Sequence, residues 1–229
     1  MKNKVALVTG SSSGIGKAIV SKLLELDYIV YGLSRSKQEE QINFKAIECD
    51  LKDTAKLENV IKNLLKKTDV DILVNSAGLG KFEPLEEFNI SQIKDIIDTN
   101  LTSPMILSSL CLRSLKKTKG KIFNISSIEA LKASKFSAVY SASKAGLHHF
   151  GSSLFEEVRK SGVNIISIHP DLTQTNFFNN LHFEPKDNEL MHLLPLDIAK
   201  AIEDILKMRE GVSITELTIR TQYFGIQKK

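Results

Sequence analysis

The chain has few of the features on which several classes of protein depend. Among its 229 residues only two are cysteines, Cys49 and Cys111, and they form neither a Cys-x-x-Cys pair nor a Cys/His cluster. This argues against a disulfide framework and a structural zinc site, and it fits a reducing cytosol. No apolar run approaches the ~18 residues that a membrane helix needs. We therefore expect a cytoplasmic protein without a membrane span.

A strong excess of charge of one sign is also lacking. Lys and Arg number 31 and Asp and Glu 27, which leaves a net charge of +4. That is well short of the clustered excess expected of a nucleic-acid-binding protein. The most basic run, 113–121, lies at a predicted helix end, where cations suit the helix dipole. We interpret it as a solvated face, with a nucleic-acid patch as the alternative, and expect no nucleic-acid partner.

The five histidines do not form a metal-binding pattern in the sequence. His148 and His149 are adjacent, so they point to different faces of a helix. No carboxylate or cysteine stands near them at a spacing typical of metal ligands. We therefore expect no metal site.

What is present is the composition of a folded domain, with 42% apolar and 25% charged residues. Repeats, low-complexity tracts and Pro/Gly-rich linkers are absent, so we expect residues 1–229 to form a single domain. Short β-rich apolar runs alternate with helical patterns, which is typical of βα units around a parallel sheet. The predicted strands are Val5–Thr9, Ile29–Leu33, Phe44–Glu48, Ile72–Asn75, Lys121–Ser126, Val163–His169 and Ile214–Ile219.

Between these runs, apolar residues recur at helical spacing, so each stripe would pack on a face of the sheet. The predicted helices are Ile15–Leu26, Leu57–Lys66, Gln92–Leu115, Ala138–Ser161 and Asp197–Met208. The fold class is thus α/β, a doubly wound seven-stranded parallel sheet with helices on both faces. The least regular segment, 176–195, follows the sixth strand. Ligands of such sheets bind beyond the carboxyl ends of the strands, so we predict a substrate lid there, with a surface loop as the alternative.

A glycine-rich loop follows the first predicted strand and opens the first helix. It reads Thr9-Gly-Ser-Ser-Ser-Gly-Ile-Gly16, with glycines at 10, 14 and 16. Glycines there permit a tight turn and close approach of a pyrophosphate, while the helix N-terminus offers free N–H donors. The spacing departs from the usual Rossmann fingerprint, and an ordinary strand-to-helix turn is the alternative.

Ser34 and Arg35 follow the second predicted strand, where a dinucleotide fold meets the adenosine ribose. An acid there would bind a free 2′-hydroxyl and repel a phosphate, whereas a guanidinium can hold a 2′-phosphate bidentately. The pair therefore predicts NADP(H), with a solvated arginine as the alternative.

Tyr140 and Lys144 are four residues apart at the start of a long helical pattern, so both project from one face. A free tyrosine has a pKa near 10 and is a poor base at neutral pH. A cation ~4 Å away contributes roughly 4 kcal/mol at an effective dielectric constant of 20, enough to lower that pKa by ~2–3 units. We therefore expect a general acid/base with a lowered pKa, although Tyr-x-x-x-Lys alone is common on ordinary helices.

These motifs, in this order, resemble those of the compact, single-domain short-chain dehydrogenases/reductases. The resemblance covers essentially the whole chain and implies a Rossmann fold and hydride transfer at a nicotinamide. Further matching motifs are Asp50-Leu51 after the third strand, Asn75-Ser76-Ala77-Gly78 after the fourth, Asn100 in a helix, Ser126-Ser127 after the fifth, and Pro170 with Thr175 after the sixth.

The resemblance also implies the site residues. The serine thirteen positions before Tyr140 is Ser127, which is favoured over Ser126. Ser127 would hydrogen-bond the substrate carbonyl, Tyr140 supply the proton, Lys144 hold the ribose hydroxyls and depress the pKa of Tyr140, and Asn100 position a water. The implied cofactor-binding residues are Gly10, Ser12, Ser13, Gly14, Ile15, Gly16, Ser34, Arg35, Asp50, Leu51, Asn75, Ser76, Ala77, Gly78, Tyr140, Lys144, Pro170, Thr173 and Thr175.

Two residues depart from the family pattern. Ser76 replaces an asparagine, and Asp171 replaces a glycine near the nicotinamide, where it brings a negative charge and disfavours positive φ. The sequence thus predicts an NADP(H)-dependent oxidoreductase that interconverts a carbonyl and a secondary alcohol on a small molecule. The alternative is a non-catalytic NADP-binding regulator or scaffold of the same fold. The family's long helices also imply a homodimer or homotetramer.

Overall fold

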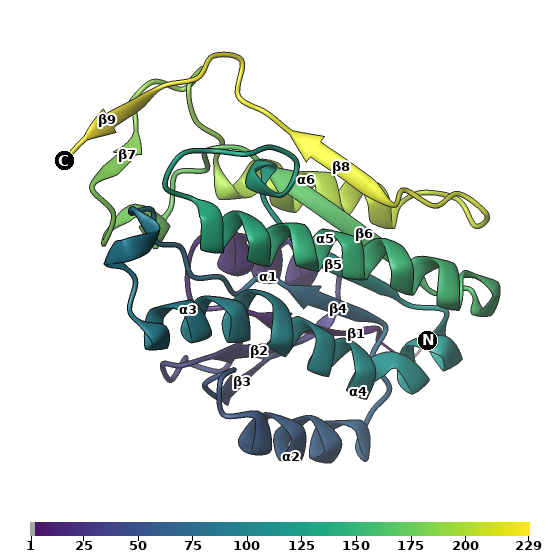
Figure 1. Cartoon of the computed structure of the whole chain (residues 1–229). Coiled ribbons are helices and arrows are strands. Elements are labelled where there is room, and N and C mark those ends of the chain that lie inside the picture. Colours follow the sequence, from purple (N-terminus) through teal and green to yellow (C-terminus); the bar gives the residue numbers. More distant parts are fainter. Residues whose placement is uncertain (1–2) are drawn as a thin grey trace.

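The computed structural model describes residues 3–229, and a seven-stranded parallel sheet forms its centre (Figure 1). The strand order is β3-β2-β1-β4-β5-β6-β8, so the chain winds outward in two directions from β1 and β4. This confirms the predicted doubly wound α/β sheet. The strands are β1 Val5–Thr9, β2 Ile29–Ser34, β3 Phe44–Glu48, β4 Ile72–Asn75, β5 Lys121–Ile125, β6 Asn164–Pro170 and β8 Glu216–Ile219.

Two layers of helices cover the sheet, because successive side chains of a strand point to opposite faces. On β1, Ala6 and Val8 pack in one apolar core and Val5 and Leu7 in the other. Helices α1 and α6 contribute to the first core, and α2, α4 and α5 to the second (Figure 1). The helices are α1 Gly14–Glu25, α2 Thr54–Leu65, α3 Ile90–Ile97, α4 Ser103–Thr118, α5 Ala138–Val158 and α6 Pro195–Leu206. Within residues 3–229 no helix has the length and apolar character that crossing a bilayer demands.

The helix predicted over 92–115 is interrupted. A π-helical turn, Asp98–Thr102, separates α3 from α4. Pro104 has no N–H, so it cannot make the α-helical bond to the carbonyl of Asn100. Ser103 instead donates both its backbone N–H and, over 2.6 Å, its hydroxyl to the carbonyl of Asp98. Such turns often occur at functional sites, and this one carries Asn100.

The predicted lid segment has more structure than its sequence suggests. It holds a short 3-10 turn, Asn176–Phe178, and strand β7 Phe183–Pro185, which pairs antiparallel with the C-terminal strand β9 Ile226–Lys228. Figure 1 shows this ribbon at its upper left, beyond the carboxyl end of β6. The backbone N–H of Tyr223 also donates to the carbonyl of Leu190 over 2.9 Å. The C-terminal residues therefore hold the segment in place.

Candidate active site

The glycine loop lies between β1 and α1 and requires its glycines. Gly10 and Gly14 have φ values of +68° and +53°, which side-chain-bearing residues rarely adopt. A Cβ on Gly10 would lie 3.0 Å from the backbone of Ala77, and one on Gly16 only 2.2 Å from the carbonyl oxygen of Gly10. The loop therefore packs closely against both its own turn and the loop after β4.

The N-terminus of α1 suits an anionic group. The side chain of its N-cap residue, Ser13, makes no capping hydrogen bond, and the first turn of the helix contains no acidic residue. The N–H groups of the first turn, on Gly14, Ile15 and Gly16, have no intrahelical acceptor. Thr175 lies against this turn, because a Cβ on Gly14 would stand 3.2 Å from its methyl group. The structure thus fits diphosphate binding at the predicted residues, with Ser12 and Ser13 exposed beside them.

The loop after β4 is held in register by Thr9, a residue that the sequence analysis did not assign. Thr9 Oγ1 accepts hydrogen bonds from the backbone N–H groups of Ser76 and Ala77, at 3.0 and 3.1 Å. Asn75 donates through Nδ2 to Asn124 Oδ1 over 2.8 Å. Thr9 ends β1 and directly precedes the glycine loop. This position is the signal that could have identified it.

At the end of β2, Ser34 is buried and Arg35 is exposed. Gln38, also unassigned by the sequence analysis, joins this end to the glycine loop. Its Oε1 accepts from the hydroxyls of Ser11 and Ser34, at 2.6 and 3.0 Å, and its Nε2 donates to the carbonyl of Ser11 over 3.3 Å. This amide therefore lies beside Ser34 at the carboxyl end of β2. No short-range pattern marks it, since the contact depends on how 36–41 folds back.

Asp50 and Leu51 follow β3, the strand beside β2. Asp50 Oδ1 accepts from the backbone N–H of Lys52 over 3.0 Å, so this carboxylate orders its own turn. Leu51 is buried, and its carbonyl oxygen lies 2.9 Å from Ser103 Oγ, so it shares the one hydroxyl hydrogen with the carbonyl of Asp98. Both residues therefore lie at the carboxyl edge of the sheet, as their positions in the sequence predict.

The two serines after β5 differ in what their hydroxyls do. Ser126 Oγ donates to the carbonyl of Lys144 over 3.1 Å, so it serves the packing of α5. Ser127 Oγ accepts from the backbone N–H of Glu129 over 3.2 Å, which leaves its hydrogen free to donate. This difference favours Ser127 as the residue that would contact a substrate carbonyl.

Tyr140 and Lys144 lie on one face of α5 and are 7% and 4% exposed. Burial raises the pKa of Tyr140 to about 12, with Glu129 adding to the rise and the Ser127 hydroxyl opposing it. The expected lowering of this pKa is therefore wrong for this arrangement. The physical reason is that desolvation disfavours the phenolate, while the Lys144 ammonium lies 5.9 Å from the ring centroid and donates to the carbonyl of Ile125 over 2.8 Å.

The same burial lowers the pKa of Lys144 to about 8. Asn100 lies beside it, since a Cβ on Gly78 would be 3.4 Å from Lys144 Nζ and 3.6 Å from Asn100 Oδ1. Asn100 exchanges two 2.8 Å hydrogen bonds with the backbone of Leu79 and donates to Ser143 Oγ over 3.0 Å. The π-helical turn thereby joins the loop after β4 to α5, and Gly78, Asn100 and Lys144 converge.

An aromatic cluster covers Tyr140. Its ring centroid lies 5.2 Å from that of Phe82 and 5.8 Å from that of Phe177. Phe183 of β7 lies 5.3 Å from Phe82 and 5.8 Å from Phe178. Two of the rings, Phe177 and Phe178, come from the turn 176–178, and Phe177 packs directly on the tyrosine ring.

The residues after β6 complete the site. Thr173 donates its hydroxyl to the carbonyl of Asp171 over 2.9 Å, and Thr175 Oγ1 accepts from the N–H of Phe177 over 3.2 Å. Asp171 does not take positive φ. Its carboxylate accepts from the N–H of Leu172 over 2.9 Å and lies 3.5 Å from Nε of Arg220. Asp171, which stands where the family pattern has a glycine, thus anchors the C-terminal segment.

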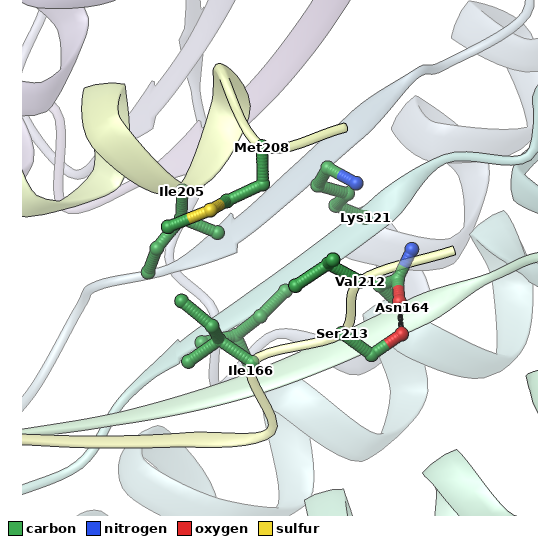
Figure 2. Close-up of a pocket in the computed structure, with 8 residues that line it drawn as sticks. Lys121, Asn164, Ile166, Ile205, Met208, Val212 and Ser213 are labelled. Atoms are coloured by element: carbon green, nitrogen blue, oxygen red, sulfur yellow. Dashed lines mark hydrogen bonds between the residues drawn. The ribbon is translucent and has the colours of Figure 1, made fainter. Parts of the chain in front are cut away.

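A pocket at the opposite end of the sheet offers no rival site (Figure 2). It lies between the amino ends of β5 and β6 and the loop after α6, where Ser213 donates to Asn164. Its volume of about 10 Å³ is no more than one water molecule requires. The predicted site residues Asn100 and Lys144 converge instead near the carboxyl ends of the strands.

Comparison with known proteins agrees with this geometry. The family described as short chain dehydrogenase matches residues 4–185. An uncharacterized oxidoreductase of Staphylococcus epidermidis is 31% identical over 229 residues, covering 96% of this chain and 98% of its own. A similar oxidoreductase of Staphylococcus aureus is 29% identical over 231 residues, with the same coverage.

Solved structures show the same likeness. A 4-hydroxyisoleucine dehydrogenase complexed with NADH aligns with a TM-score of 0.83 and 28% identity, covering 96% of this chain and 97% of its own. An alcohol dehydrogenase from the archaeon Thermococcus sibiricus, complexed with 5-hydroxy-NADP, aligns with a TM-score of 0.86, 27% identity and the same coverage. This chain belongs to the short-chain dehydrogenase family of oxidoreductases.

Proposed function

We propose that the protein is an NADP(H)-dependent oxidoreductase that interconverts a carbonyl group and a secondary alcohol. One observation carries the proposal. Ser127, Tyr140, Lys144 and Asn100 meet at the carboxyl ends of the strands, next to a glycine loop whose helix N-terminus lacks a side-chain cap. A protein that only bound the dinucleotide would need the loop but not the buried tyrosine and lysine. The arrangement therefore favours an enzyme over a regulatory or scaffold protein.

The choice of NADP(H) rests on Arg35. Its guanidinium is exposed at the end of β2 and follows an uncharged residue, Ser34. A guanidinium there can pair with a 2′-phosphate, and no carboxylate precedes it to repel one. The two solved relatives hold NADH and 5-hydroxy-NADP respectively, so this residue, and not the likeness of fold, supports the choice.

The mechanism follows from the side chains. A bound nicotinamide cofactor supplies or accepts the hydride. For reduction, the Tyr140 hydroxyl donates its proton to the carbonyl oxygen while the Ser127 hydroxyl donates a hydrogen bond to the same atom. Because the pKa of Tyr140 is about 12, the phenol carries its proton at neutral pH, which suits reduction. Lys144 would hold the cofactor's ribose hydroxyls, and Asn100 holds the loop that faces Lys144.

The substrate class follows from the aromatic cluster. Phe82 and Phe177 pack against Tyr140, Phe183 packs against Phe82, and the three offer apolar surface and ring edges. Carbonyl compounds with an apolar or aromatic substituent would gain most from this surface. We propose that residues 176–195 act as the lid over them.

Two measurements test the function. NADPH consumption is followed over a panel of aldehydes, ketones and hydroxy acids, and one apolar member should be turned over. Tyr140→Phe, which removes only the phenolic oxygen, should then lower kcat by roughly 10²–10⁴-fold, the usual contribution of a general acid, while NADPH affinity should fall far less. NADPH binding without consumption across the panel would support the non-catalytic alternative.

We also propose that the protein forms a homodimer or homotetramer through α4 and α5. Leu110 on α4 and Phe150 and Phe155 on α5 are only partly buried, and Met105 is 41% exposed. Pairing of these helices between subunits would cover that apolar surface.

A further inference from the structure

Three potential ligands, far apart in the sequence, meet between the sheet and α5. They are His148 on α5, His169 on β6 and Glu216 at the start of β8, and one ligand atom from each lies within 4.8 Å of the others. The two imidazole rings are perpendicular, with centroids 4.7 Å apart. The ring of His169 is completely buried, whereas the Glu216 side chain is 44% exposed. The group is therefore reachable from solvent through Glu216.

The hydrogen bond of His169 determines its tautomer. Its Nδ1 lies 3.2 Å from the carbonyl oxygen of Ser127. A carbonyl can only accept, so Nδ1 carries the hydrogen and Nε2 of the neutral ring presents a lone pair. That lone pair lies 3.5 Å from Glu216 Oε1, which is also an acceptor. Two acceptors that face each other at this distance repel unless a hydrogen-bond donor, a proton or a metal ion lies against both of them.

His148 brings a second imidazole to the same place. Its Nε2 lies 3.9 Å from Glu216 Oε2, and within residues 3–229 neither its Nδ1 nor His169 Nε2 has a hydrogen-bond partner.

We propose that His148, His169 and Glu216 bind one divalent transition-metal ion, with Zn²⁺ as the representative. Two imidazoles and one carboxylate are a ligand set that such ions prefer, and they would leave a further position for water. At metal–ligand distances of ~2.0–2.2 Å and tetrahedral angles, two ligand atoms lie about 3.3–3.6 Å apart. Ligand atoms that now lie up to 4.8 Å apart must therefore approach by about 1.2–1.5 Å, which the partly exposed Glu216 side chain allows. The bond from His169 Nδ1 to a backbone carbonyl is the outer contact that metal-binding histidines usually make.

The site would have a structural consequence beyond the proposed reaction. It would tie the edge strand β8 to β6 and α5, and it would hold the carbonyl of Ser127 through His169. The ion itself would not contact the substrate, because His169 stands between it and Ser127. The inference does not depend on the identity of the substrate or of the cofactor.

Metal uptake by the purified full-length chain, untagged and freed of metal with a chelator, tests the proposal. Zn²⁺ binding is measured by calorimetry, and Co²⁺ binding by the visible absorption that nitrogen and oxygen ligands produce. We expect one ion per chain. Glu216→Gln and His148→Gln should each weaken binding roughly tenfold or more, while the neighbouring exposed His149→Gln should leave it unchanged. His149 differs from His148 only in its face of the helix, so it is the matched control.

Each outcome either supports or overturns the proposed metal site. No uptake of either ion by the unmodified chain overturns the proposal, as does uptake that survives both Glu216→Gln and His148→Gln. A His169 ring that nuclear magnetic resonance shows to be protonated at pH 7 would mean that a proton fills the position. If one variant fails to fold, as judged by circular dichroism, the other and the Co²⁺ spectrum of the unmodified chain still give the answer. None of these readouts requires turnover.

Discussion

The buried ammonium of Lys144 makes the stability of this fold depend on pH in a way that Lys144→Met would remove. The side chain is 4% exposed, and burial lowers its pKa from 10.5 to about 8. Between these two values the unfolded chain binds more protons than the folded one, so the free energy of unfolding rises with pH. Methionine has a similar length and does not titrate, so the variant lacks this dependence.

The size of the effect follows from the two pKa values of 10.5 and about 8. At about 1.36 kcal/mol per pKa unit, the charged lysine costs roughly 3 kcal/mol at pH 7. At pH 9.5 the folded lysine is mostly neutral, and the remaining cost is about 1.4 kcal/mol. The unmodified chain should therefore gain about 2 kcal/mol relative to Lys144→Met between pH 7 and 9.5. Tyr140, whose pKa is raised, acts in the opposite direction only above its unfolded value near 10.

Urea denaturation at several pH values between 7 and 9.5 measures this difference. The unsatisfied Ile125 carbonyl shifts the stability of the variant by a constant, so only the slope against pH matters. Lys116→Met, at an exposed position of α4, is the matched control and should follow the unmodified chain. Parallel curves for the unmodified chain and Lys144→Met would refute the reasoning, because they would show that the ammonium is solvated or permanently neutral.

Three further predictions concern the cofactor, the lid and assembly. Arg35→Ala should weaken NADPH binding ten- to a hundredfold, from the loss of roughly 1.5–3 kcal/mol, and leave NADH binding nearly unchanged. Ser34→Asp should reverse the cofactor preference. Equal kcat/KM values for both cofactors on the unmodified protein would contradict the assignment of Arg35. Phe177→Ala should expose Tyr140 and lower its pKa from about 12 toward 10, so the alkaline limb of the reduction profile should move to lower pH, and an unmoved limb would mean that other rings bury the phenol. Sedimentation should show a dimer or tetramer, and a monomer at micromolar concentration would exclude the proposed pairing of α4 and α5.

Local patterns in the sequence predicted most of the fold. Short continuous apolar runs mark strands buried on both faces, and the seven expected strands coincide with those of the sheet to within two residues at each end. The glycine loop could be predicted equally well, because positive φ angles or the close approach of neighbouring atoms leave glycine as the residue that fits at 10, 14 and 16. The helical spacing of Tyr140 and Lys144 placed both side chains on one face, as the structure shows. These features depend on neighbours within a few residues.

Features that depend on distant parts of the chain were decided only by the tertiary structure. The direction in which the pKa of Tyr140 shifts depends on its burial under Phe82 and Phe177, which come from two separate loops. Strand β7 exists because β9, some forty residues later, supplies its hydrogen-bond partners. His148 has no suitable ligand near it in the sequence, yet the sheet brings His169 and Glu216 to it. Spacing along the chain sets local conformation, but charge and pKa depend on what surrounds a group in three dimensions, and only packing determines that.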